Sequence, residues 1–183
     1  MRCHQNPAKP FRQRGVVLII ALIILLALTL IGVSGMSTTS MQARMSANTR
    51  DRQIAFQAAE AALREGERYV QNNPMDASMF DSNCTNGMCD CSSAALGCVE
   101  YWTDSGLSVW TTAARHKTYT VNNGQLAAQP EYIIEYMGYV VPDGVSTINS
   151  NTGPGDPQMF RITALGTGQS PNAKVMLQST YKK

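Results

Sequence analysis

One long apolar stretch marks the first third of the chain. Residues 16–31 (VVLIIALIILLALTLI) are apolar at all positions but one, and no charged residue occurs from residue 15 to residue 43. As a helix, residues 16–36 would be about 31 Å long at ~1.5 Å per residue. Because the hydrocarbon core of a bilayer is roughly 30 Å thick, the pattern predicts a transmembrane helix over residues 16–36.

The helical pattern continues beyond this stretch. The segment AFQAAEAALREGE is rich in strong helix formers, and apolar residues recur at intervals compatible with one helix face. Proline cannot continue the hydrogen-bond ladder, so the sequence Asn-Asn-Pro at residues 72–74 predicts the end of the helix. We therefore predict one helix over residues 16–72, about 85 Å long. Its C-terminal half is expected to pack on a globular head through Phe56, Ala59, Leu63 and Val70.

Downstream of residue 73 the pattern changes to short runs rich in β-branched and aromatic residues, bounded by glycine, proline and asparagine. The sequence predicts a head over residues 73–183, with an antiparallel sheet packed on the helix, an α+β fold. Residues 74–98 are loop-rich, and residues 166–172 are expected to form the turn of a hairpin. The clearest predicted strands are 131–141, 159–165 and 173–181, and weaker ones are 99–102, 108–112 and 116–121.

The residues before the apolar stretch are basic. No acidic residue precedes residue 15, whereas four basic residues do: Arg2, Lys9, Arg12 and Arg14. This asymmetry predicts that the N-terminus stays in the cytoplasm and that the bulk of the chain lies outside. A cleaved secretory signal would have a shorter apolar region, of about 7–15 residues, and a small-residue cleavage site. A buried helix of a soluble protein is a second alternative, but such helices are seldom apolar on every side.

Charge elsewhere gives no indication of nucleic-acid binding. From Val16 onward the chain has 11 basic and 13 acidic residues, with no cluster of lysine and arginine. The chain from Val16 onward is thus mildly acidic and lacks the basic surface by which proteins neutralise phosphates. We expect no nucleic-acid partner.

Four of the five cysteines lie close together in the loop-rich segment: Cys84, Cys89, Cys91 and Cys98. An even number of cysteines in an exported segment favours two disulfides, and three pairings are possible. A zinc site is the alternative because thiolates are suitable ligands, but the paired C-x-x-C spacing is absent. The sequence therefore predicts a disulfide-containing loop region without a defined pairing.

Other candidate sites in the head are weak. His116 is the only histidine after the N-terminal segment, is expected in a solvated strand, and is accompanied by no nucleophile elbow or Walker-type loop. We expect neither an enzyme nor a cofactor. The loop from 142 to 158 has oxygen ligands that could hold calcium, but EF-hand spacing is absent and turn chemistry explains its composition. These weak calcium candidates are Asp143, Asn149, Asn151 and Asp156.

The junction at Gly15 resembles the processing site of type IV prepilins. Residues 12–15 (RQRG) are followed directly by the apolar residues 16–19 (VVLI). The resemblance implies a class III leader over residues 1–15, cleavage between Gly15 and Val16 by a prepilin peptidase, and methylation of the new amino group of Val16.

Two further segments, 48–52 (NTRDR) and 55–67 (AFQAAEAALREGE), resemble the N-terminal signature of the PilX family of type IV pilus minor pilins. With Gly15 and the apolar stretch, the resemblance covers about residues 13–68. It implies a single-pass inner-membrane protein with a periplasmic head that later enters the pilus. The implied partners are the prepilin peptidase, other minor pilins, the major pilin, the inner-membrane assembly platform and a large tip adhesin. The implied role is a priming or tip complex that promotes pilus assembly and supports adhesion and twitching motility.

One position departs from the family pattern. Most pilins carry a glutamate as the fifth residue after cleavage, where it can pair with the terminal amine of a neighbouring subunit, but this chain has Ile20. A carboxylate in lipid is costly unless it is paired, so isoleucine removes both a penalty and an assembly contact. We therefore expect this subunit at or near the tip of the filament, where no earlier subunit offers its amine. Two alternatives to a pilus subunit stay open: a minor pseudopilin of a type II secretion system, and a signal-anchored periplasmic binding protein or enzyme.

Overall fold

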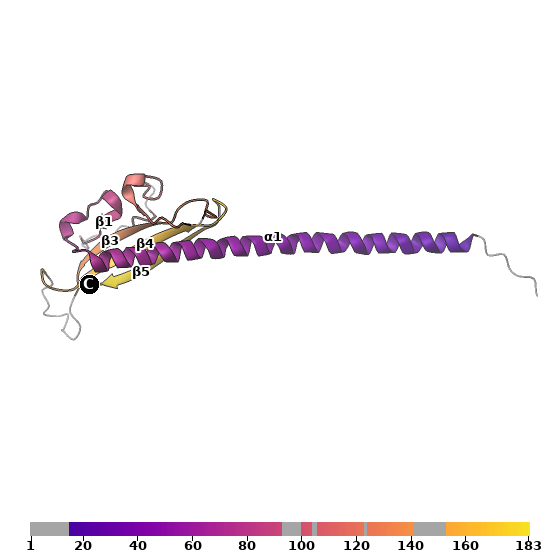
Figure 1. Ribbon diagram of the computed structural model, residues 1–183, viewed down its shortest axis with the longest axis horizontal. Helices are drawn as coiled ribbons and strands as arrows, with labels where there is room; N and C mark the ends of the chain where they lie inside the picture. The colour runs from indigo at the N-terminus through magenta and orange to yellow at the C-terminus, as the bar shows by residue number, and fades with distance from the viewer. Residues whose placement is uncertain (1–14, 93–99, 104–105, 123, 141–152) are drawn as a thin grey trace, which may run out of the picture. The chain divides into compact units, whose positions relative to one another are not determined.

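The computed structural model describes residues 15–92, 100–103, 106–122, 124–140 and 153–183. The chain divides into two compact units, Met1–Ser46 and Ala47–Lys183. A single helix, α1 (Val16–Asn72), contributes its N-terminal part to the first unit and its C-terminal part to the second (Figure 1). The bounds of α1 coincide with those of the helix predicted from the sequence.

The second unit contains a five-stranded mixed sheet, which makes the fold α+β as predicted. The strand order is β1-β3-β4-β5, and β2 pairs with β3. The bounds are Met88–Asp90 for β1, Lys117–Thr118 for β2, Glu131–Tyr139 for β3, Gln158–Thr167 for β4 and Lys174–Lys182 for β5. The described residues also include three short 3₁₀ helices among the loops: Ala77–Met79 (η1), Thr85–Gly87 (η2) and Ala113–Arg115 (η4).

The expectation of a purely antiparallel sheet is wrong for one strand. β1 runs parallel to β3, with Met88 opposite Ile134, whereas the other pairings are antiparallel. A parallel pair needs a connection of a dozen residues or more, and the long segment between Asp90 and Glu131 provides it. β1 itself lies in the segment that the sequence predicted to be loop.

The three clearest predicted strands are present as β3, β4 and β5, and the β4–β5 hairpin has a turn shorter than predicted. Of the weaker strands, residues 101–102 and 109–111 form turns instead, and 116–121 contributes only the two residues of β2. The reason is that Tyr101 and Val109 bury their side chains around the cysteines, so their apolar character serves packing without a strand ladder.

The side of the sheet that faces α1 forms the helix-facing core. Alternate residues of β3 point to this side, where they pack with residues of α1, β1 and β4 and with the loop after α1. Its buried members are Ala62, Val70, Met75, Phe80, Met88, Tyr132, Ile134, Tyr136, Phe160, Ile162 and Ala164, with Leu63 partly buried against them.

Small residues line the buried face of α1. Ala55, Ala59 and Ala62 are completely buried, whereas Phe56 is 47% exposed. The prediction that Phe56 packs on the head is therefore wrong. The physical reason is close approach of the backbones: a Cβ added at Gly166 of β4 would lie 2.2 Å from the carbonyl oxygen of Ala55 and 2.4 Å from the amide nitrogen of Ala59. A phenylalanine cannot occupy such a contact.

The opposite side of the sheet forms a second core around the cysteines. Ile133 of β3 packs here with Tyr101, Val109 and the buried cysteines Cys84, Cys89 and Cys91. A disulfide joins Cys84 to Cys89. The predicted disulfide-containing loop region thus covers part of one face of the sheet, while α1 covers the other.

Candidate functional site

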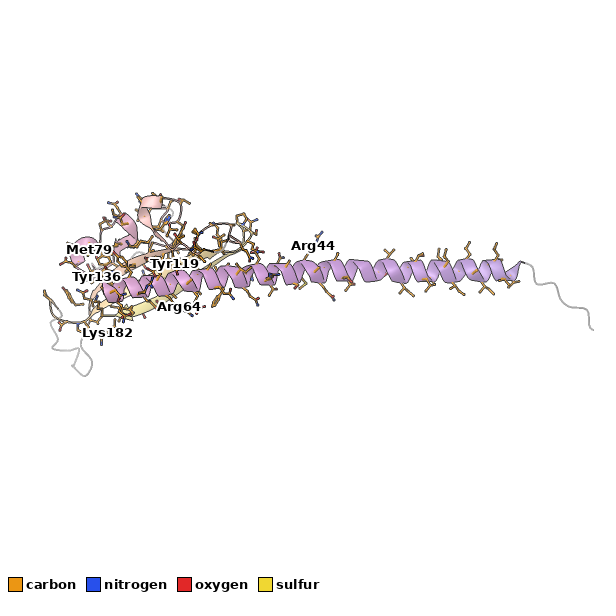
Figure 2. All side chains as sticks on the ribbon, viewed as in Figure 1. Arg44, Arg64, Met79, Tyr119, Tyr136 and Lys182 are labelled. Atoms are coloured by element: carbon orange, nitrogen blue, oxygen red, sulfur yellow. A yellow bond between two sulfur atoms is a disulfide. The ribbon has the colours of Figure 1, made fainter. Side chains whose placement is uncertain are left out.

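The apolar stretch of α1 leaves its large side chains uncovered in the first unit. Their exposed fractions run from 51% at Ile20 to 76% at Leu18, and side chains project both above and below the helix in the view of Figure 2. Among the described residues, α1 is the one helix long and apolar enough to cross a membrane by length and composition. Arg44 is the first charged residue of α1. Such a surface requires lipid or other apolar helices around it.

Several hydroxyl groups of this part of α1 bond within the helix. Thr29 donates to the carbonyl oxygen of Leu26 at 2.8 Å, Ser34 to that of Leu30 at 2.9 Å, and Thr39 to that of Gly35 at 3.0 Å. Unsatisfied polar groups are costly in lipid because no water is available there. These internal hydrogen bonds make the hydroxyl residues compatible with an apolar surrounding.

The expected cleavage site lies at the start of the described chain. Gly15 directly precedes α1, and no heavy atom lies within 4 Å of the position that its Cβ would take. Val16 is the first residue of α1 and is 54% exposed. The leader residues 1–14 lie outside the described residues. The backbone around the Gly15–Val16 bond is therefore accessible in the part that is described.

In the second unit, Asp51 ties α1 to the β4–β5 turn. One of its carboxylate oxygens accepts from the backbone N–H of Gln169 at 2.6 Å, and the other accepts from Ser170 at 3.2 Å. A Cβ on Gly168 would lie 2.2 Å from the first of these oxygens, so only glycine allows the turn to come this close. Asp51 belongs to the NTRDR segment that carries the family resemblance. Its hydrogen bonds give that segment a physical role, which is to hold α1 against the β4–β5 turn.

A buried ion pair lies on the side of the sheet opposite α1. Glu135 of β3 is completely buried, and Arg161, its register partner on β4, donates from Nε at 2.7 Å and from Nη2 at 2.9 Å. These hydrogen bonds with Glu135 raise the pKa of Arg161, which keeps it charged. Arg161 Nη2 also lies 3.8 Å from Cys91 Sγ. Sequence reasoning missed this pair, although a lone charge in the middle of each predicted strand was a signal for it.

His116 is not solvated, contrary to the sequence-based expectation. Its side chain is only 7% exposed, its Nδ1 lies 2.8 Å from the carbonyl oxygen of Val109, and its Nε2 lies 3.4 Å from the Glu131 carboxylate. Burial raises the pKa of Glu131, while the charges of His116 and Lys174 oppose that shift. The contacts of His116 hold the segment before β2 onto the sheet.

Only some of the remaining predicted residues are among those that the structure describes. Cys91 is disulfide-bonded like Cys84 and Cys89, whereas Cys98 lies outside the described residues. Of the calcium candidates, Asp143, Asn149 and Asn151 also lie outside. Asp156 accepts a hydrogen bond from the backbone N–H of Gly153 at 2.9 Å, a turn contact. Within the described residues, no group of three or more histidine, cysteine or acidic side chains is placed to hold a metal ion.

α1 is one helix whose N-terminal part is apolar and uncovered and whose C-terminal part packs on a sheet. This arrangement defines a pilin-like α+β protein, and the apolar segment fits a membrane anchor. Two family models match the chain: PilX N-terminal over residues 14–64, and Type IV pilus assembly protein PilX C-term over residues 45–183. The chain belongs to the PilX family of type IV pilus assembly proteins. The resemblance found in residues 13–68 is thereby confirmed, and the match extends through the head. No curated protein and no solved structure matches the chain.

Proposed function

We propose that this chain is a minor pilin that works as a structural subunit of a type IV pilus priming complex. Membership of the PilX family supports a role in pilus assembly. The observation that carries the proposal is the uncovered apolar segment of α1, because one such surface suits both a lipid bilayer and the packed helices of a filament. The complex initiates assembly of the filament, and the filament then supports adhesion and twitching motility.

The proposed maturation begins in the inner membrane. Residues 1–15 form the leader, residues 16–36 span the bilayer, and the head over residues 73–183 lies in the periplasm. The prepilin peptidase cuts after Gly15, and the amino group of Val16 is methylated. The chain then meets the other minor pilins, the major pilin, the assembly platform and a large tip adhesin.

We expect the chain isolated from membranes of cells that make pili to begin at methylated Val16. Intact-mass measurement tests this directly, because loss of residues 1–15 and addition of a methyl group change the mass by known amounts. A Gly15→Leu variant is the control, and it should keep Met1, because a bulky side chain does not suit a tight peptidase cleft. A native chain that retains Met1 would contradict the pilin function and favour a signal-anchored protein.

Ile20 supports a position at or near the tip of the filament. A subunit without the usual glutamate cannot pair with the terminal amine of the subunit ahead of it, so it needs no such neighbour. We expect Ile20→Glu to insert and to be cleaved normally, and to raise several-fold the number of copies per major pilin in sheared pili, because the carboxylate supplies the missing pairing group.

The matched control for this experiment is Ile20→Gln, which has the shape of glutamate without its charge and should leave the copy number unchanged. Quantitative mass spectrometry of sheared filaments gives the ratio, and immunogold labelling gives the position. Native protein spread along the shaft, together with an unchanged ratio in Ile20→Glu, would refute the tip position while leaving the pilin function intact.

A further inference from the structure

β5 is an edge strand, and no described strand pairs with its outer side (Figure 1). Its register with β4 is unbroken over nine pairs, whereas the β3–β4 register shifts between Tyr136 and Tyr139. Proteins usually protect an edge with a bulge, a proline, a short strand or charges along it. β5 has nine residues, no proline or glycine, and charges only at its ends, Lys174 and Lys182. As far as the structure describes the chain, this edge is therefore able to accept another strand.

The backbone groups that face outward can be assigned from the ladder. Gln158 and Lys183 exchange two backbone hydrogen bonds, at 2.7 and 2.9 Å. Bonded and non-bonded pairs alternate along an antiparallel ladder, so every second residue of β5 directs its N–H and C=O groups away from β4. In the middle of the strand these residues are Met176, Gln178 and Thr180.

A small pocket lies beside the outward-facing residues. Met176 and Gln178 line it together with Trp102, Thr163 and Leu177, and its volume is about 210 Å³. Sites for small molecules usually measure about 300–1,000 Å³, so this pocket suits a single side chain. Trp102 also carries a buried indole N–H that has no hydrogen-bond partner among the described residues. An added strand would direct every second side chain toward this face.

The lysines at the two ends of β5 determine which kind of added strand fits this edge. If a second copy of β5 paired antiparallel about Gln178, Lys174 of each copy would lie opposite Lys182 of the other, and like charges directly opposite are destabilising. A segment with an acidic residue at each end would instead place opposite charges together. The pocket between the two lysines favours an apolar side chain at the centre of that segment.

We propose that the β5 edge binds an extended segment of a partner protein, acidic at both ends and apolar at its centre, as an additional strand. Backbone hydrogen bonds to Met176, Gln178 and Thr180 supply affinity, and the pocket with the two flanking lysines supplies specificity. The surface belongs to the head alone, so it does not depend on the position of the subunit in the filament.

The test uses the full chain in detergent and a fluorescent nine-residue peptide of alternating threonine and valine, with leucine at its centre and glutamate at both ends. We expect saturable binding by anisotropy, and binding at least about tenfold weaker when lysine replaces both glutamates. Thr180→Pro should weaken binding at least about tenfold, because proline removes an outward N–H that the β4 ladder does not use. The matched control Thr180→Ala should bind like the native chain.

Amide exchange gives a second readout. Peptide binding should slow exchange at Met176, Gln178 and Thr180 and leave their neighbours in β5, already bonded to β4, unchanged.

Absence of binding, equal affinity for both peptides, unchanged affinity in Thr180→Pro, or pairing of β5 with a second copy would each overturn the proposal. If Thr180→Pro does not fold, the double variant Lys174→Glu/Lys182→Glu decides, since it should reverse the preference between the peptides.

Discussion

The substitution Gly166→Ala is expected to lower the free energy of unfolding by about 3 kcal/mol, the upper part of the usual range for overpacking. The new methyl group would lie 2.2 Å from the carbonyl oxygen of Ala55 and 2.9 Å from Cα of Ala59. Both atoms belong to the backbone of α1, so no rotamer change relieves the contact and the helix must move away from β4. That movement opens the helix-facing core.

Tryptophan fluorescence during urea unfolding measures this effect on the head, because both tryptophans, Trp102 and Trp110, lie in the second unit. The control is Gly124→Ala, since no heavy atom lies within 4 Å of its Cβ position and its φ is not in the left-handed region. That variant should be neutral or more stable by about 0.5 kcal/mol, because alanine restricts the unfolded chain. Equal stability of the two variants would show that α1 and β4 do not approach closely.

The pattern of apolar and polar residues predicted the helices and strands that form mainly because of their own amino-acid composition. The apolar stretch and the alanine-rich segment gave α1, and alternating β-branched runs gave β3, β4 and β5. β1 was missed because three residues, Met-Cys-Asp, carry no periodicity, and only pairing with β3 makes them a strand.

The packing prediction for α1 was wrong at Phe56 for a related reason. The largest apolar side chain was assigned to the core, whereas the distance between helix and sheet admits only small residues at that contact. The distance is set by glycine on both elements: a Cβ at Gly66 of α1 would lie 2.6 Å from Ile162 of β4, and Gly166 gives the reciprocal contact. These glycines were visible in the sequence, but their partners follow only from the register of the sheet.

The register also creates the Glu135–Arg161 pair, and we expect Arg161→Met to cost about 4 kcal/mol of unfolding free energy. Glu135 is completely buried, so loss of the guanidinium leaves a carboxylate without either of its two charge-assisted hydrogen bonds. Arg64→Met is the matched control, because Arg64 pairs with Glu60 on α1 with the arginine side chain 72% exposed. An exposed pair of this kind contributes roughly 0.3–0.5 kcal/mol.

The double variant Glu135→Leu/Arg161→Met separates the pair from the packing around it. Replacement of a buried ion pair by apolar residues of similar volume is often neutral or stabilising, so the double variant should recover most of the stability lost in Arg161→Met. Urea unfolding followed by tryptophan fluorescence gives the coupling free energy from the four proteins of the cycle. If the double variant were as unstable as Arg161→Met, the loss would come from other contacts of Arg161, such as the one with Cys91, and not from an uncompensated buried charge. If the double variant recovers its stability, the ion pair contributes little net stability to the fold. Its role would then be to specify the β3–β4 register, since a shift by one residue would bury both charges without a partner.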